Sequence, residues 1–279
     1  MRVRATSRLL AVIGDPVGHS LSPAMHNAAI TALGLDAVFL ALRSSAAAFE
    51  ALVRSLLAAG GAACVTVPHK REAARLADQP ADLVRRTGAC NVVWAQGVGI
   101  AGDNTDVGAV RDEARRLMDG RRPSRTLLLG TGGSARAAAV AVSDEWPGSE
   151  VAVVSRSAER AVEFMTWAAS AEVAARRASV GEAPTAHLVI NATPLGLKPD
   201  DPLPLPDEEL QRIAPAALLD LVYARGETAL VRHARRRGTS ASDGRGVLVL
   251  QGASAFRHFF RVEPPVEIMR AAVEDALRA

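Results

Sequence analysis

The feature that most constrains the fold of this chain is a regular alternation of short apolar runs and longer alanine-rich segments. The runs are rich in Val, Leu and Ile and have the length of buried strands, whereas the segments between them have the length and apolar spacing of helices. This alternation is typical of parallel βαβ units. With 279 residues, the chain is long enough for two compact α/β units that each bury a core.

The first α/β unit is predicted to occupy roughly the first hundred residues. Its strands are expected at residues 9–13, 37–42, 63–67 and 91–94, with helices at 24–33 and 46–59. The apolar run at residues 9–13 follows a basic start, as in a signal peptide, but it ends at Gly14-Asp15-Pro16 without a cleavage site. We therefore interpret it as the first strand of a cytoplasmic protein.

A second series of predicted strands and helices alternates as in a nucleotide-binding fold. Its strands are expected at residues 126–129, 151–154, 188–190 and 218–222, with a helix at 135–142. The proline-rich stretch at 198–206 is predicted to be a loop within this unit, because the strand pattern resumes after it. Two further helices, at 251–260 and 265–277, bring no strand of their own and are expected to pack back on the first unit.

Composition excludes several classes of function. Hydrophobic residues make up 49% of the chain and charged residues 23%, without a run of membrane-spanning length, so a soluble protein is expected. The net charge is only +3 and the arginines are scattered among acids, which favours a small anionic substrate over nucleic acid. Cys64 and Cys90 are too few for a zinc quartet and are expected to be buried thiols, so no metal is predicted.

A few residue types are rare enough to draw attention to their positions. Only two of the 33 basic residues are lysines, Lys70 and Lys198, and the chain has a single tyrosine, Tyr223. Its four asparagines are Asn27, Asn91, Asn104 and Asn191. Where such types persist in an arginine-rich chain, a chemical requirement is a reasonable hypothesis.

A glycine-rich turn separates the strand predicted at 126–129 from an alanine-rich helix. Glycines there allow backbone N–H groups to approach a pyrophosphate at the positive end of the helix. A glycine-rich strand-to-helix connection without a ligand is the alternative. The predicted cofactor-binding residues of this turn are Gly130, Thr131, Gly132, Gly133, Ser134 and Ala135.

The strand predicted at 151–154 ends in Ser155-Arg156-Ser157, with Arg160 one turn later. NAD sites usually have an acid at this strand end, whereas NADP sites offer cations and hydroxyls to the 2′-phosphate. These four residues therefore predict NADP, provided that Glu159 turns away. A solvated pair of arginines at a helix start is the alternative.

Polar residues at strand ends of the first unit suggest a substrate site. Ser20 and Ser22 lie close to a helix start and could bind a carboxylate, and Ser22 could also cap that helix before Pro23. Lys70 follows the strand at 63–67, at the edge where open α/β sheets bind ligands, and a lysine can exchange a proton that arginine retains. We expect His69 to be a surface or capping residue and not the base.

Asp106 supplies a carboxylate at the predicted junction of the two units. Substrate and cofactor would meet there. Asp106 could equally be a helix N-cap, which is the commonest role for an Asp before a helix.

Taken together, nine short motifs resemble the shikimate dehydrogenase family, and they occur in the right order along nearly the whole chain. They are SLSP at 20–23, VTVPHK at 65–70, GACN at 88–91, GDNTD at 102–106, GTGGSAR at 130–136, SRS at 155–157, NATPLG at 191–196, DLVY at 220–223 and QGA at 251–253.

The resemblance implies roles for individual residues. Ser20 and Ser22 would hold the substrate carboxylate with Tyr223 nearby, and Lys70 and Asp106 would exchange the proton during hydride transfer. It also implies Asn191, Thr193 and Gly246 as further cofactor-binding residues. The residues that would contact the ring hydroxyls are Thr66, Lys70, Asn91, Asp106 and Gln251.

The resemblance also implies a domain plan and an activity. Residues 1–105 with 242–279 would form a substrate-binding catalytic domain, and residues 106–241 a Rossmann-like NADP-binding domain. The activity would be the NADP-dependent, reversible reduction of 3-dehydroshikimate to shikimate, in aromatic amino acid biosynthesis, by a monomer or homodimer.

The sequence departs from the family pattern at four places. Cys64 and Ser155 each replace a common asparagine, Val107 follows Asp106 where glycine is frequent, and Ala224-Arg225 replaces a proline-containing sequence. These departures keep open a relative acting on quinate or aminoshikimate, although Ser22 favours shikimate because quinate-preferring members often carry threonine there. A non-catalytic ligand-binding homologue is disfavoured because Lys70 and Asp106 are both present.

Overall fold

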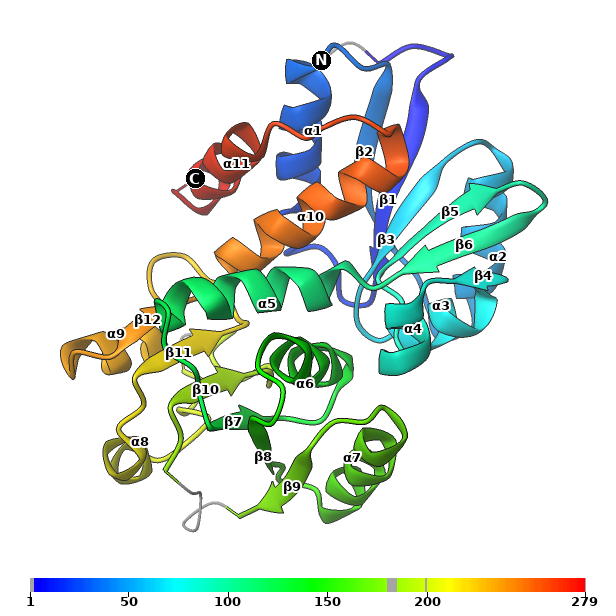
Figure 1. The fold of residues 1–279 in the computed structure, drawn as a ribbon. Helices are drawn as coiled ribbons and strands as arrows, with labels where there is room; N and C mark the ends of the chain where they lie inside the picture. Colours follow the sequence, from blue (N-terminus) through cyan, green and yellow to red (C-terminus); the bar gives the residue numbers. More distant parts are fainter. Residues whose placement is uncertain (1–2, 180–184, 199, 279) are drawn as a thin grey trace. The chain divides into compact units, whose positions relative to one another are not determined.

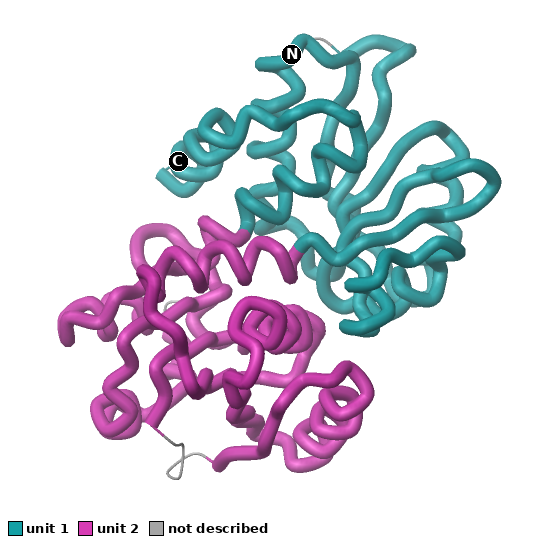
Figure 2. The backbone as a smooth tube through the Cα atoms, viewed as in Figure 1, with its two compact units in different colours: residues 1–105, 248–279 teal, residues 106–247 magenta. Residues whose placement is uncertain are grey.

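The computed structural model describes residues 3–179, 185–198 and 200–278. Its chain divides into two compact units (Figure 2). Unit 1 comprises residues 1–105 and 248–279, and unit 2 comprises residues 106–247. Each unit is built on a six-stranded sheet covered by helices, so the predicted two-domain α/β class is confirmed (Figure 1).

The sheet of unit 1 is mixed. β1 runs parallel to β2 and β3, whereas β5 runs antiparallel to β3 and β6. The pattern of parallel βαβ units therefore holds for β1 to β3 but not for β5 and β6. The physical reason is the two-residue turn at Gly97-Val98, where Gly97 has φ of +60° and joins β5 to β6 as a hairpin. The strand order is β2-β1-β3-β5-β6-β4, with bounds β1 Arg8–Gly14, β2 Ala37–Arg43, β3 Ala62–Val65, β4 Gln79–Pro80, β5 Val92–Gln96 and β6 Gly99–Asp103.

Side chains of β1 alternate between two cores, one on each face of this sheet. Leu10 and Val12 belong to the core that also contains Met25, whereas Ala11 and Ile13 belong to the core that contains Phe49. The run at residues 9–13 is thus a buried strand, as predicted. The helices of unit 1 are α1 Ser22–Ala32, α2 Ala46–Ala58, α3 Lys70–Leu76, α4 Asp82–Thr87, α10 Arg245–Phe260 and α11 Val266–Arg278.

The last two helices return to unit 1, as the sequence predicts. Phe256 and Phe259 of α10 and Met269 of α11 join the core that contains Met25 of α1. Figure 1 shows α10 and α11 near α1, although they are more than 200 residues apart in the chain. A pair of helices without a sheet of its own needs a surface against which to bury its apolar side chains, and this core provides that surface.

The sheet of unit 2 is entirely parallel, in the order β12-β11-β10-β7-β8-β9. Leu127, Leu129, Val189 and Leu218 form part of one core cluster against this sheet. The predicted loop at 198–206 contains no helix or strand among its described residues, and residue 199 lies outside them. The elements are α5 Thr105–Met118, β7 Arg125–Leu129, α6 Gly133–Glu145, β8 Glu150–Val154, α7 Ala158–Ser170, β9 Ala175–Ala178, β10 Leu188–Asn191, α8 Asp207–Ile213, β11 Ala217–Asp220, α9 Ala229–Arg236 and β12 Ser240–Ser242.

Both cysteines are buried and neither belongs to a disulfide, which confirms the prediction of buried thiols. Burial raises the pKa of the Cys90 thiol to about 12, so it stays protonated. In the described part of the chain, none of the helices combines the length and apolarity needed to cross a membrane.

Candidate active site

The glycine-rich turn of unit 2 leaves the start of α6 open to an anion. Gly130 has φ of +105°, and a Cβ at this position would lie 3.0 Å from the carbonyl oxygen of Ala192, so only glycine fits. Gly132, the N-cap of α6, is exposed and has open space where a side chain would be. This helix start has neither a side-chain cap nor an acid in its first turn. Its N–H groups are thus suited to a phosphate.

The other residues of this turn differ in exposure. Thr131, Gly133 and Ser134 are half-buried, whereas Ala135 is fully buried. Ala135 can therefore contribute only its backbone to a ligand.

The segment after β8 is organised by its two serines. The Ser155 hydroxyl oxygen accepts a hydrogen bond from the Ser157 N–H at 3.3 Å, and the Ser157 hydroxyl accepts one from the Arg160 N–H at 3.2 Å, which caps α7. Arg156 and Arg160 are exposed, and their side chains form no ion pair within the described part of the chain. Their guanidinium groups are thus available to a phosphate. Glu159 is exposed in the first turn of α7.

Asn191 is buried at the end of β10 and fixes the following turn. Its side-chain oxygen accepts hydrogen bonds from the Thr193 N–H at 3.0 Å and the Thr193 hydroxyl at 2.7 Å. Its amide nitrogen donates to the carboxylate of Asp220 at 2.8 Å and to the Leu195 carbonyl at 3.3 Å. With its side chain engaged in this way, Asn191 shapes the turn, and Thr193 is the half-buried residue that the turn presents.

Asp220, at the end of β11, was missed as a candidate functional residue. Its fully buried carboxylate also accepts hydrogen bonds from the Thr228 hydroxyl at 2.7 Å and the Val222 N–H at 3.1 Å. Burial raises the pKa of this carboxyl to about 6, although the hydrogen bonds oppose the shift. An acid in an otherwise apolar strand was the signal in the sequence. Tyr223 follows three residues later and is half-buried.

In unit 1, the loops after β1 and β3 lie against each other. The Asp15 N–H donates to the Val67 carbonyl at 3.0 Å, and a Cβ at Gly14 would lie 3.0 Å from that same oxygen. Thr66, half-buried, donates its N–H to the Ile13 carbonyl at 2.9 Å. The loop that leads to Ser20 and Ser22 and the loop that leads to Lys70 therefore begin next to each other.

Lys70 is the first residue of α3 and is half-buried. Its carbonyl accepts a hydrogen bond from the Cys90 N–H at 2.8 Å, which brings the turn before Asn91 next to the lysine backbone.

The structure corrects the expectation for His69. This residue is only 3% exposed, its ring stacks on Phe49 with centroids 4.5 Å apart, and its Nε2 lies 2.8 Å from the carbonyl oxygen of Ser44. His69 provides no side-chain cap to α3. It is a packing residue, because α2 covers the position that a surface histidine would expose to water.

The alternative of Ser22 as a helix cap is also wrong. Helix α1 already includes Ser22, its N-cap is Leu21, and no side chain caps it. The Ser22 N–H instead donates to the Ser20 hydroxyl oxygen at 3.3 Å. Ser22 is buried and Ser20 half-buried, and the Ser20 hydroxyl lies beside the first residue of an uncapped helix.

Asparagines hold the segment that leads into α5. The buried Asn91 donates to the Thr105 hydroxyl at 3.0 Å and accepts from the Thr105 N–H at 2.8 Å. Asn104, also buried, donates to the Thr87 hydroxyl and the Ala89 carbonyl, each at 3.0 Å. Asn104 was not among the predicted site residues, although its rarity could have flagged it.

Asp106 does not cap α5, because it lies within the first helical turn, directly after Thr105. Its side chain is half-buried.

Two predicted residues lie on α10. Gln251 is half-buried and donates its amide to the Leu248 carbonyl at 2.8 Å. Gly246 is the second residue of the helix, and a Cβ there would lie 2.9 Å from the carboxyl carbon of Glu113.

Comparison with family models finds matches at both ends of the chain. Residues 12–93 match the model described as shikimate dehydrogenase substrate binding domain, and residues 244–274 match the one described as shikimate 5′-dehydrogenase C-terminal domain.

Individual relatives match over nearly the full length. A protein of Synechocystis sp. named shikimate dehydrogenase (NADP(+)) is 35% identical over 97% of this chain and 96% of its own. The crystal structure of a Thermus thermophilus shikimate 5-dehydrogenase in complex with NADP(H) and shikimate is 33% identical, with a TM-score of 0.83 over 96% of this chain and 99% of that one.

A quinate dehydrogenase from Corynebacterium glutamicum, in complex with NAD, also has this fold. It is 26% identical, with a TM-score of 0.86 over 95% of this chain and 98% of its own. The full-length identities above 30% decide between a general dinucleotide-binding fold and one family. The chain belongs to the shikimate dehydrogenase family.

Proposed function

We propose that this protein catalyses the NADP-dependent, reversible reduction of 3-dehydroshikimate to shikimate. The observation that carries the proposal is the identity of 35% over nearly the whole chain to a relative named shikimate dehydrogenase (NADP(+)). An activity in aromatic amino acid biosynthesis follows from that reaction.

The residues of unit 2 fit NADP. The uncapped start of α6 offers N–H groups to the pyrophosphate, and a side chain at Gly130 would collide with Ala192. Arg156 and Arg160 offer two exposed cations to the 2′-phosphate, with Ser155 and Ser157 shaping the turn between them. We assign Thr193, held by Asn191, and Gly246 to the remainder of this site.

In unit 1 we assign Ser20 and Ser22 to the substrate carboxylate. In unit 2 we assign Tyr223 to the same group of the substrate. The uncapped start of α1 supports this assignment, because its N–H groups add a favourable partial charge for an anion. Thr66, Asn91 and Gln251 are assigned to the ring hydroxyls. The engagement of Asn91 with Thr105 gives its amide a fixed orientation.

Lys70 and Asp106 are proposed to move the proton. NADPH, when bound, supplies the hydride to the carbonyl carbon. The Lys70 ammonium donates a proton to the carbonyl oxygen as negative charge develops there, and the Asp106 carboxylate orients that ammonium. The neutral lysine then regains a proton from solvent. In the reverse direction, the same pair accepts the hydroxyl proton of shikimate.

This assignment gives each unit a role. Unit 1 is proposed as the substrate-binding catalytic domain and unit 2 as the Rossmann-like NADP-binding domain. We also propose a cytoplasmic location, since Cys64 and Cys90 remain thiols, as is usual in a reducing compartment. The proposed oligomeric state is a monomer or homodimer.

A second candidate function is quinate dehydrogenase, because a quinate dehydrogenase has the same fold over 95% of this chain. Initial rates with shikimate, quinate and aminoshikimate, each with NADP and NAD, distinguish the candidates. The proposal predicts the highest kcat/KM for shikimate with NADP, and a preference for quinate with NAD would overturn it. Ligand binding by calorimetry without turnover would instead indicate a non-catalytic homologue.

A further inference from the structure

The chain passes between the two units twice, and both passages lie inside helices. The first boundary follows Thr105, within α5, and the second follows Val247, within α10 (Figure 2). Asp106 lies at the start of α5 and Gly246 at the start of α10. The position of α5 relative to the start of α10 therefore affects Asp106, which we propose to be catalytic, and Gly246, which we propose to bind the cofactor.

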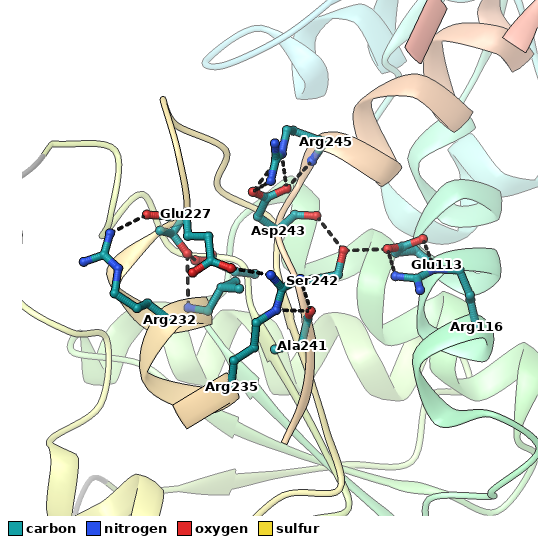
Figure 3. A network of polar contacts seen from close by, with 12 residues as sticks. Glu113, Arg116, Glu227, Arg232, Arg235, Ala241, Ser242, Asp243 and Arg245 are labelled. Atoms are coloured by element: carbon teal, nitrogen blue, oxygen red, sulfur yellow. Dashed lines mark hydrogen bonds and ion pairs between the residues drawn. The ribbon is translucent and has the colours of Figure 1, made fainter. Parts of the chain in front are cut away.

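A buried carboxylate joins the two helices on the side of unit 2. Glu113 of α5 is 5% exposed, and its Oε1 accepts a hydrogen bond of 2.6 Å from the hydroxyl of Ser242, three residues before α10 (Figure 3). Arg116, one turn further along α5, donates to both carboxylate oxygens of Glu113, at 2.6 and 3.0 Å. The hydrogen bonds to this carboxylate raise the pKa of Arg116, so the guanidinium stays charged.

The same carboxylate packs against the first turn of α10. A Cβ at Gly246 would lie 2.9 Å from the Glu113 carboxyl carbon and 3.0 Å from each of its oxygens. A carboxylate is favourable at a helix N-terminus, because the macrodipole is positive there. Asp243 and Arg245 pair with each other beside it, at 2.9 Å. The Ser242 hydroxyl lies 2.6 Å from Glu113 and 3.2 Å from the Asp243 carbonyl oxygen, so the Glu113 contact is the shorter of the two (Figure 3).

We propose that Glu113 is a positioning residue for the reaction, which holds the helix of Asp106 in register with the start of α10. Asp106 and Glu113 are seven residues apart, two helical turns, so they lie on the same face of α5. The contact with Ser242 and Gly246 thus fixes both the rotation and the translation of that face. This inference rests on the proposed function, which makes Asp106 a catalytic residue.

Glu113→Ala and Glu113→Gln test the inference. Alanine removes the contact with Ser242, whereas glutamine keeps the shape and an acceptor oxygen. We expect kcat to fall about 10- to 100-fold in Glu113→Ala, because misplacement of a catalytic group by about 1 Å costs about that much, with the KM for shikimate within about twofold. Glu113→Gln should recover most of the loss.

Arg115→Gln is the matched control. Arg115 lies on the same helix and pairs with Glu145 of α6 at 2.6 Å, so its loss removes an ion pair of α5 without touching α10. We expect its kcat to stay within about twofold of the wild type. Wild-type kcat in Glu113→Ala, equal losses in Glu113→Ala and Glu113→Gln, or an equal loss in Arg115→Gln would each overturn the proposal.

Amide hydrogen exchange separates this inference from the proposed function. Exchange in α5 and in the first turn of α10 should be faster in Glu113→Ala and near wild type in Glu113→Gln. If the wild-type protein does not turn over shikimate, the proposed function fails, while unchanged exchange in Glu113→Ala would refute the role of Glu113 independently.

The Glu113→Ala/Gly246→Ala double variant adds a second test. If Gly246 is a glycine because Glu113 packs against it, Gly246→Ala alone should displace α10, and removal of the carboxylate should relieve the collision. We expect the double variant to have a higher melting temperature than the sum of the two single changes predicts. Strict additivity would show that the two residues are not coupled.

Discussion

The side-chain oxygen of Asn91 accepts a hydrogen bond from the backbone N–H of Thr105 at 2.8 Å. Thr105 begins α5, so the turn that ends at Asn91 fixes the helix start that presents Asp106. The neighbouring Asn104 ties the same segment to Thr87 and Ala89. Both asparagines are buried, which makes the segment before Asp106 a rigid support for the carboxylate that we propose to be catalytic.

Lys70→Ala and Asp106→Asn should each lower kcat by about 10²- to 10⁴-fold, the usual contribution of proton transfer, with a much smaller change in the KM for shikimate. Steady-state kinetics and circular dichroism measure the effect and check the fold. Lys198→Ala is the control, because Lys198 is the other lysine and is exposed in a loop. Full turnover in both active-site variants would contradict the assignment.

Arg156→Ala should raise the KM for NADP about 10- to 100-fold and leave the KM for NAD nearly unchanged. The reason is the loss of charge-assisted hydrogen bonds to the 2′-phosphate, which NAD lacks. Initial rates at varied concentrations of each cofactor measure the ratio. Arg122→Ala, an exposed arginine before the amino end of β7, should affect neither cofactor. An equal loss with both cofactors in Arg156→Ala would indicate misfolding instead.

His26 should make the protein sensitive to acid. It is fully buried, its ring stacks on Phe39 at 4.2 Å, and burial lowers its pKa from 6.5 to about 3. Between these values only the unfolded chain binds the proton, so the free energy of unfolding falls by about 1.4 kcal/mol for each pH unit below about 6.5. Denaturant titrations from pH 7 to pH 4 measure this slope. In His26→Leu the contribution should disappear, and an unchanged slope would show that His26 is not its source.

Asp220 should have the opposite effect. Burial raises its pKa from 3.8 to about 6, so between these values the folded protein holds a proton that the unfolded chain has released. Its contribution to the free energy of unfolding therefore falls by up to about 3 kcal/mol as the pH rises through this window. The difference in stability between Asp220→Asn and the wild type should shift in favour of the variant from pH 4 to pH 6.5. A constant difference would contradict the raised pKa.

The central strands could be predicted because burial on both faces leaves a continuous apolar signal. Leu9 to Ile13 and Val151 to Val154 are such cases, and both series of strands appear where they were expected. β9, with the sequence Ala-Arg-Arg-Ala, and β4, with Gln-Pro, carry no such signal, because an edge strand does not need apolar side chains on both faces.

Side-chain environments that depend on distant segments were harder to predict. The burial of His69 depends on Phe49 and Ser44, which come from a different part of the chain. The position of Asp106 within α5 depends on the hydrogen bond from the Thr105 N–H to Asn91, at the first residue of that helix. In the sequence, Glu113 cannot be told from any other acid on a helix, because its partner Ser242 lies more than a hundred residues later. Motifs marked segments that carry candidate residues, but only the fold shows which groups support them.

The most direct test of the proposed function is the absorbance of NADPH at about 340 nm when shikimate and NADP are added to the purified protein. The proposal predicts a rise that requires both compounds and that reverses when 3-dehydroshikimate and NADPH are supplied instead. No change in absorbance with shikimate, together with turnover of another substrate such as quinate with NAD, would contradict it.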